Sequence, residues 1–301
     1  MKKHIYIYSP SGAVRDKAAF KRGVKYLEQR GHAVEVDANA LSSYQRFAGD
    51  DATRLAAIAR AAASGADVAL ISRGGYGLTR ILADINYRAV AKAIDRGTQF
   101  VGISDFTAFQ LALLAKTGHA TWAGPALCEG FGPAEGPDDI MDDCFHDLLL
   151  GQGEGSGWRV PTGSSVELAR TRRGVVWGGN LTVLTSLLGT PYFPAIRGGI
   201  LFLEDIAEHP YRIERMLTQL LHAGVLAHQS ALLLGQFTEY KLTPHDKGFK
   251  LESVVQWLRS QLKIPVLTGL PYGHVPTKVL LPVGQKADLS MLGREALLYW
   301  G

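Results

Sequence analysis

The chain has few cysteines and no long apolar run. Its 301 residues include two cysteines, Cys128 and Cys144, too few for a disulfide framework, so we expect reduced thiols. No apolar stretch approaches the roughly 18 residues that span a bilayer. The apolar segment His4–Tyr8 is interrupted at once by Ser9-Pro10, which is typical of a first strand and not of an export signal. These absences predict a cytoplasmic protein with no membrane partner.

Charge of one sign is not concentrated anywhere in the chain. The formal net charge of +4 comes from 32 Lys and Arg against 28 Asp and Glu, spread along the sequence. Such a distribution gives no basic surface for a phosphate backbone, so we expect no nucleic-acid partner. The spacing of metal ligands is missing as well, because Glu208-His209 has no His-x-x-x-His or cysteine pair to complete it. We therefore expect no metal site.

The glycine motifs of nucleotide-binding proteins are incomplete. Gly75-Tyr76-Gly77 supplies the first two glycines of a dinucleotide fingerprint, but Arg80 occupies the third position, and the segment lacks the Gly-Lys-Ser/Thr of a Walker loop. This disfavours a nucleotide-binding enzyme. A glycine pair after a strand can also bring a backbone N–H close to an oxyanion. A simple tight turn explains the glycines equally well.

The first half of the chain alternates short β-like segments with longer amphipathic ones. This alternation predicts βαβ units and a parallel sheet. Ligands bind at the carboxyl ends of the strands in such sheets. Three candidate loops, Ser9–Gly12, Arg73–Gly77 and the corner at Ser104, are expected at that edge.

Three separate segments each supply one member of a serine hydrolase. Ser104 lies where a strand gives way to a helix, so its hydroxyl would project beside the first N–H groups of that helix. Glu204 ends the apolar strand Ile200–Leu203, and His274 lies in a turn-forming stretch. Taken alone, each has an ordinary explanation: a helix N-cap, a solvated loop acid and a surface histidine. Together they follow one known order of hydrolase residues, although Phe106 replaces the second glycine of the common elbow.

The composition changes after residue 150. The next seven residues are glycine-rich and nearly lack apolar side chains, which is typical of a linker. We predict an α/β domain with the nucleophile over residues 1–150, a linker over 151–165, and a domain with the Glu and the His over 166–301. The predicted fold class is α/β, with an N-terminal flavodoxin-like parallel sheet between helices and a smaller C-terminal mixed α/β domain. The clearest helix of the second half begins at Pro210 and ends before Gly224.

At these residues the chain resembles the LD-carboxypeptidase family of serine peptidases, in particular the murein tetrapeptide LD-carboxypeptidases. The segments that carry the resemblance span nearly the full length: Ser9–Gly12, Arg46–Gly49, Arg73–Gly77, Ser104–Ala108, Trp177–Leu181, Leu203–Ile206, His209-Pro210 and Gly273-His274. The resemblance implies Ser104 as nucleophile, Glu204 as orienting acid and His274 as base. It also implies oxyanion donors from the backbone N–H groups of Gly75 and Asp105.

The resemblance further implies a cytoplasmic homodimer that releases terminal D-alanine from recycled murein tetrapeptides by cleaving the L-D bond after the third residue. No metal or organic cofactor is expected. Recognition of the terminal carboxylate needs a cation or backbone donors, and we expect Arg73 and Asn180 to contact substrate. Two alternatives stay open: a microcin C immunity-type peptidase, from a related branch with the same triad, and a non-catalytic two-domain peptide-binding protein. The missing export signal counts against the binding protein.

Overall fold

The computed structural model describes residues 2–162, 168 and 170–301, and the chain divides into two compact units. The first unit comprises Met1–Gly153, Gly189–Pro194 and Pro276–Gly284, and the second comprises Glu154–Leu188, Ala195–Val275 and Gln285–Gly301. Residues 163–167, where we placed the boundary between the linker and the second domain, lie outside the described residues.

The first unit is built on a six-stranded sheet with strand order β11-β5-β4-β3-β1-β2. Its strands are β1 (His4–Tyr8), β2 (Ala33–Val36), β3 (Val68–Ile71), β4 (Gln99–Gly102), β5 (Thr121–Ala123) and β11 (Leu281–Val283). Strands β1 to β5 pair in parallel, and β11 runs antiparallel to β5. The order β2-β1-β3-β4-β5 is that of flavodoxin-like sheets. The predicted fold of the N-terminal domain is therefore confirmed.

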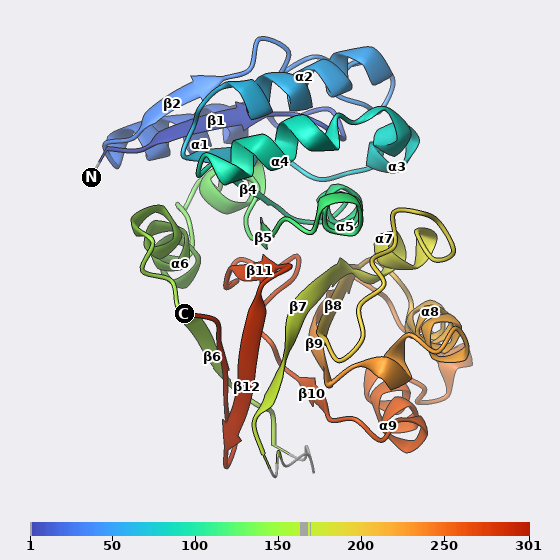
Figure 1. Cartoon of the computed structure of the whole chain (residues 1–301). Coiled ribbons are helices and arrows are strands. Elements are labelled where there is room, and N and C mark those ends of the chain that lie inside the picture. The colour runs from blue at the N-terminus through green and yellow to red at the C-terminus, as the bar shows by residue number, and fades with distance from the viewer. Residues whose placement is uncertain (1, 163–167, 169) are drawn as a thin grey trace. The chain divides into compact units, whose positions relative to one another are not determined.

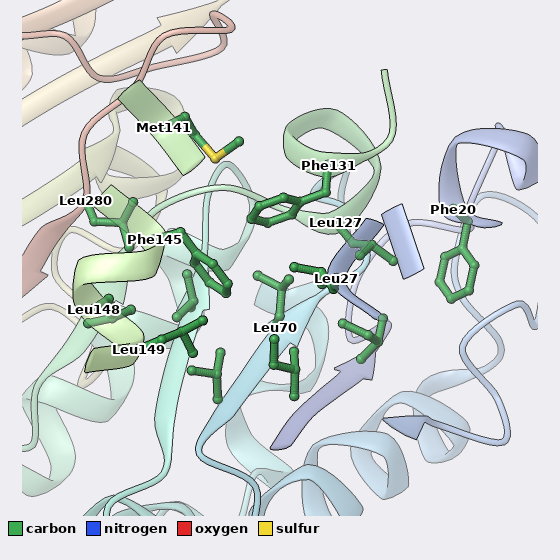
Figure 2. Packing of buried hydrophobic residues seen from close by; sticks show 14 of the residues in the cluster. Phe20, Leu27, Leu70, Leu127, Phe131, Met141, Phe145, Leu148, Leu149 and Leu280 are labelled. Carbon is green, nitrogen blue, oxygen red and sulfur yellow. The ribbon is translucent and has the colours of Figure 1, made fainter. Parts of the chain in front are cut away.

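Helices cover both faces of this sheet (Figure 1). They are α1 (Lys17–Gln29), α2 (Asp51–Ala63), α3 (Leu78–Ile81), η1 (Leu82–Asp84), α4 (Tyr87–Asp95), α5 (Phe106–Thr117), η2 (Leu127–Phe131) and α6 (Asp139–Leu150). Figure 2 shows one core layer, in which Phe131 of η2 and Phe145 of α6 pack with Leu70 of β3. In the other layer, the rings of Phe100 on β4 and Phe109 on α5 lie 5.7 Å apart. Alternate residues of the strands thus fill both layers, as parallel sheets require.

The second unit contains a seven-stranded mixed sheet with strand order β10-β9-β8-β7-β12-β13-β6. Its strands are β6 (Gly155–Arg159), β7 (Arg172–Asn180), β8 (Ile200–Ile206), β9 (Ala231–Thr238), β10 (Val266–Thr268), β12 (Lys286–Leu292) and β13 (Glu295–Tyr299). Strands β7 to β10 are parallel, and β12, β13 and β6 are added antiparallel. The helical elements are α7 (Leu181–Ser186), α8 (Pro210–His222), η3 (Leu226–His228), η4 (Pro244–Asp246) and α9 (Leu251–Gln261). This is the predicted mixed α/β domain.

The limits of the two units differ from the expected ones in two places. Part of the segment predicted as a linker forms strand β6. This strand pairs with β13 along its whole length. Its first glycine reflects close packing, since a Cβ on Gly155 would lie 2.8 Å from the carbonyl oxygen of Leu298. Strand β11 was expected in the second domain but belongs to the first unit, because it completes the edge of the first sheet against β5.

Candidate active site

Ser104 lies at a strained corner between β4 and α5. Its φ is +68°, a left-handed conformation that costs a residue with a side chain about 1–3 kcal/mol. Ser104 does not cap the helix, since the N-cap position of α5 is Asp105. The turn is closed by the N–H of Thr107, which donates to the Ser104 carbonyl at 2.9 Å. A strained strand-to-helix corner is the setting of the nucleophile in many hydrolases, so the conformation favours this role over a simple N-cap.

The glycine pair after β3 lies directly against Ser104. A Cβ on Gly74 would lie 2.5 Å from the Cβ and 2.7 Å from the Oγ of Ser104, so only glycine fits there. The N–H of Gly12 donates to the Gly74 carbonyl at 3.2 Å. Because C=O and N–H point in opposite directions across a trans peptide, the N–H of Gly75 faces away from Gly12. Among the described residues, no hydrogen bond occupies the backbone N–H of Gly75 or Asp105, so both can serve an oxyanion.

The carboxylate of Asp105 connects the loops that follow β1 and β3 to the Ser104 corner. Asp105 is buried and accepts hydrogen bonds from the hydroxyl of Ser11 and from the N–H of Leu78, the latter at 2.9 Å. Burial raises the pKa of Asp105, and the hydrogen bonds partly offset this effect by favouring the charged form. Asp105 therefore helps to fix the loop that carries Gly75.

Arg54 of α2 supports the same loops from inside the first unit. Its side chain is fully buried, and its guanidinium donates to the carbonyl of Gly77 at 2.8 Å and pairs with Asp51. The sequence analysis did not single out Arg54. Its burial could have been predicted from helical spacing, because Arg54 lies three and four residues before Ala57 and Ile58 and so shares one buried face of α2 with them. A cation on the apolar face of a helix needs buried partners, and here they are loop carbonyls and a carboxylate.

The predicted acid and base are brought together within the second unit. Nδ1 of His274 lies 2.7 Å from Oε2 of Glu204, and the Glu204 side chain is fully buried. A carboxylate only accepts, so Nδ1 carries the proton and leaves Nε2 of the neutral imidazole as an acceptor. The His274 side chain is 18% exposed and therefore keeps access to solvent. This is the contact between orienting acid and general base that serine hydrolases use.

Strand pairing explains how Glu204 reaches this position. In the parallel pairing of β7 with β8, Glu204 stands opposite Asn180. On the other side, the register between β8 and β9 shifts between Leu203 and Asp205, so Glu204 has no partner in β9. Irregularities of this kind re-aim side chains at the ends of strands and are frequent next to active sites.

The segment before His274 is anchored to the end of β9. The N–H of Gln236 donates to the carbonyl of Tyr272 at 2.8 Å, and the Tyr272 side chain is buried. Gly273 has a φ of +147°, which a residue with a side chain rarely adopts. The sequence read this stretch as a turn, and the glycine conformation explains how the turn directs His274 toward Glu204.

Asn180 contacts the acid. It is buried, and its Nδ2 donates to Oε1 of Glu204 at 3.1 Å and to Oδ1 of Asp205 at 2.9 Å. Its Oδ1 accepts from the N–H of Val183 at 3.1 Å and caps α7. Its Nδ2 thus contacts two carboxylates, and the expected contact of Asn180 with substrate stays a prediction.

Asp205 is a second buried carboxylate to which the sequence analysis gave no role. It accepts from the N–H of Thr182 at 2.9 Å and from the Thr182 hydroxyl at 2.7 Å. Burial raises the pKa of Asp205, and the neighbouring Glu204 raises it further. Its fixed position gives the Asn180 amide a second anchor beside Glu204.

Arg73 follows β3 on the loop that carries Gly75. Its Nη1 donates to the carbonyl of Ala13 at 3.3 Å, and its Nε lies 3.9 Å from the Glu129 carboxylate. Substrate contact by Arg73 stays a prediction. Ser104 belongs to the first unit and the Glu204–His274 pair to the second, so the approach of Ser104 to His274 also stays a prediction.

Within residues 2–162, 168 and 170–301, no group of three or more His, Cys, Asp or Glu side chains is placed to hold a metal ion. In the same ranges, no helix combines the length and the apolar character needed to cross a bilayer.

A serine at a strained elbow and a buried acid–imidazole pair are features of serine hydrolases. Family models define the class more narrowly. The LD-carboxypeptidase N-terminal domain matches residues 5–124, and the LD-carboxypeptidase C-terminal domain matches residues 173–289. The chain belongs to the LD-carboxypeptidase family of serine peptidases, which confirms the resemblance drawn from its motifs.

Relatives with known names cover nearly the whole chain. The crystal structure of muramoyltetrapeptide carboxypeptidase from Oxalobacter formigenes is 39% identical, with a TM-score of 0.88, and the match covers 98% of this chain and 97% of that one. A Bacillus subtilis protein named "Probable murein peptide carboxypeptidase" is 30% identical, over 92% of this chain and 85% of its own. The microcin C7 self-immunity protein MccF of Escherichia coli is 27% identical, over 94% of this chain and 88% of its own.

Proposed function

We propose that this chain is a serine carboxypeptidase that releases the terminal D-alanine of murein tetrapeptides by cleaving the L-D bond after the third residue. The observation that carries the proposal is the buried Glu204 carboxylate, 2.7 Å from Nδ1 of His274, because this contact prepares an imidazole as a general base. The left-handed φ of Ser104 supports its role as nucleophile. The names of the Oxalobacter formigenes and Bacillus subtilis relatives support the substrate class.

In the proposed acylation step, Oγ of Ser104 attacks the carbonyl carbon of the third residue while Nε2 of His274 takes the hydroxyl proton. The backbone N–H groups of Gly75 and Asp105 donate to the oxyanion that forms. Glu204 stabilises the imidazolium through Nδ1. When the tetrahedral intermediate collapses, the C–N bond breaks and His274 gives its proton to the leaving amine of D-alanine.

In the proposed deacylation step, water attacks the ester carbonyl and His274 takes one of its protons. The remaining hydroxyl becomes part of the new carboxyl group of the tripeptide, and His274 returns the proton to Oγ of Ser104. Both reaction steps require Oγ of Ser104 and Nε2 of His274 to come within hydrogen-bond distance during turnover. We further propose that the protein works as a homodimer in the cytoplasm on recycled wall peptides.

A microcin C immunity-type peptidase is a second candidate, because the match to MccF extends over 94% of this chain. The two candidates share the proposed triad and differ in the group that follows the scissile bond. A terminal D-amino acid follows it in a murein tetrapeptide, whereas a nucleotide conjugate follows it in the microcin C substrate.

Product analysis separates the two candidates. The purified protein is incubated with tetrapeptides that carry meso-diaminopimelate or lysine at the third position, and with an aminoacyl sulfamoyl adenosine, and the products are weighed by mass spectrometry. We expect free D-alanine and a tripeptide from at least one tetrapeptide. Hydrolysis of the nucleotide conjugate with both tetrapeptides left intact would favour the second candidate.

A further inference from the structure

Two oppositely charged side chains, Arg54 and Asp105, are buried in the first unit close to the Ser104 corner. A buried charge is costly unless an opposite charge or hydrogen bonds compensate for it. The proposed reaction uses the backbone N–H of Asp105 but neither of these two side chains. Their burial therefore needs an explanation of its own.

The surroundings of the Asp105 carboxylate suit its charged form. The hydroxyl of Ser11 and the N–H of Leu78 donate to it, and a backbone hydrogen bond from Gly77 also favours the charged form. A carboxylate only accepts hydrogen bonds, whereas a carboxylic acid must also donate one, so a set of donors fits the ionised group. These bonds attach the loops after β1 and β3 to the residue that follows the nucleophile.

One peptide group connects Arg54 to Asp105. The C=O of Gly77 accepts from Nη1 of Arg54 at 2.8 Å, and the N–H of the same peptide, which belongs to Leu78, donates to Asp105 at 2.9 Å. The negative end of this peptide dipole thus faces the cation and the positive end faces the anion, and each hydrogen bond strengthens the other. A Cβ on Gly77 would lie 2.5 Å from Nη1 of Arg54, so glycine is needed for this approach.

The charges linked to this peptide balance each other. Arg54 also pairs with Asp51, which in turn pairs with Arg80 at 3.1 Å. Two carboxylates therefore alternate with two guanidinium groups, from Asp105 in the interior to Arg80 at the surface. Without the charge of Arg54, a negative charge would be left unbalanced beside the N–H groups proposed to receive an oxyanion, and it would repel that oxyanion.

Both proposed oxyanion donors are attached to this arrangement. Gly75 lies two residues before Gly77 on the same loop, and the second donor is the N–H of Asp105 itself. A displacement of about 1 Å at a reacting group costs roughly 100-fold in rate. Because the oxyanion forms only during the reaction, such a displacement should lower kcat and leave KM nearly unchanged.

We propose that Arg54 is a positioning residue for the oxyanion hole. Through the peptide between Gly77 and Leu78, it balances the buried charge of Asp105 and keeps the two N–H donors in place. The inference rests on the proposed function, because it gives Arg54 a part in the same reaction.

The test is a double-variant cycle that separates charge balance from packing. Arg54→Met keeps an unbranched side chain but removes the charge, and Asp105→Asn removes the opposite charge while the backbone N–H stays. We expect each single variant to lower kcat for D-alanine release about 30- to 100-fold, with KM changed less than about threefold. The double variant should be about tenfold more active than either single variant, because no unbalanced charge remains.

The matched control lies on the same helix. Arg60 of α2 pairs with the buried carboxylate of Asp37 at 2.7 Å, and Asp37 accepts further hydrogen bonds from Tyr6 and Asn39. The proposed reaction uses none of these residues. Arg60→Met, Asp37→Asn and their double variant should therefore lower Tm and keep kcat within about twofold of wild type.

Two results would overturn the inference. One is a folded Arg54→Met variant whose kcat stays within about threefold of wild type, and the other is a double variant whose loss equals the product of the two single losses. If Arg54→Met alone does not fold, the double variant is compared with Asp105→Asn. A folded and more active double variant supports charge balance, whereas an unfolded or less active one refutes it.

A second measurement keeps the inference separate from the substrate. If the wild type releases no D-alanine, the proposed function fails, and the same variants are compared by the rate at which a fluorophosphonate labels Ser104. This reaction also places a charged oxygen in the oxyanion hole, so the double variant should again be about tenfold faster than either single variant. Equal labelling rates in all four proteins, or no labelling of the wild type, would refute the role of Arg54.

Discussion

Gly74→Ala should displace the nucleophile without removing any catalytic group. The added Cβ would lie 2.5 Å from the Cβ of Ser104, whereas non-bonded carbons prefer about 3.5 Å, so one of the two backbones must shift by about 1 Å. A misplacement of this size costs roughly 100-fold in rate. Overpacking of this kind also destabilises by about 1–3 kcal/mol. We therefore expect D-alanine release to fall about 100-fold in kcat/KM, measured at 25 °C, with a modest decrease in Tm.

Gly157→Ala is the matched control for this substitution. Gly157 lies on β6, and a Cβ there meets only a carbonyl oxygen at 3.7 Å, an ordinary contact. The activity and Tm of the Gly157→Ala variant should stay close to those of the wild type. If Gly74→Ala folds and keeps wild-type kcat/KM, the close contact between Gly74 and Ser104 has no role in placing the nucleophile, and our account of the glycine pair is wrong.

Three other predictions concern the acid, its partner and a thiol. Glu204→Gln should lower kcat about 10⁴-fold in a D-alanine release assay, because the amide no longer holds the imidazolium, and a loss below tenfold would contradict its role. Asn180→Ala should lower kcat less, about tenfold, and should shift the pH profile of kcat, because Glu204 loses a donor at 3.1 Å; a change in KM alone would instead indicate substrate contact. Burial raises the pKa of Cys128 to about 12, so its reaction with Ellman's reagent should be slow at pH 8 and rise about tenfold per pH unit up to pH 10; fast labelling at pH 7 would disprove this burial.

Local patterns were sufficient to predict where two of the proposed catalytic residues lie along the strands and helices. The strand that ends at Gly102 and the helix that begins at Phe106 could be read from apolar runs and helical spacing, and they place Ser104 at a corner. Glu204 was found in the same way, at the end of an apolar strand. What the sequence could not give is the left-handed φ of Ser104, because it depends on how the glycine pair packs against it.

Contacts between distant segments account for what the sequence analysis missed. The contact of Asn180 with Glu204 was not foreseen, because only the pairing of β7 with β8 places the two residues opposite each other. Strand β11 returns to the first sheet across more than a hundred residues of intervening chain, which no local pattern records. The segment of β6 was predicted to be a linker because a glycine needed for close strand packing, such as Gly155, cannot be told from a flexible one by composition.

The most direct test of the central claim is D-alanine release by Ser104→Ala. The variant is compared with wild type and with Ser260→Ala, an exposed serine on α9, after circular dichroism has established that all three are folded. We predict a loss of about 10⁶-fold in kcat for Ser104→Ala and none for Ser260→Ala. A folded Ser104→Ala protein that releases D-alanine at a near-normal rate would contradict the proposed mechanism.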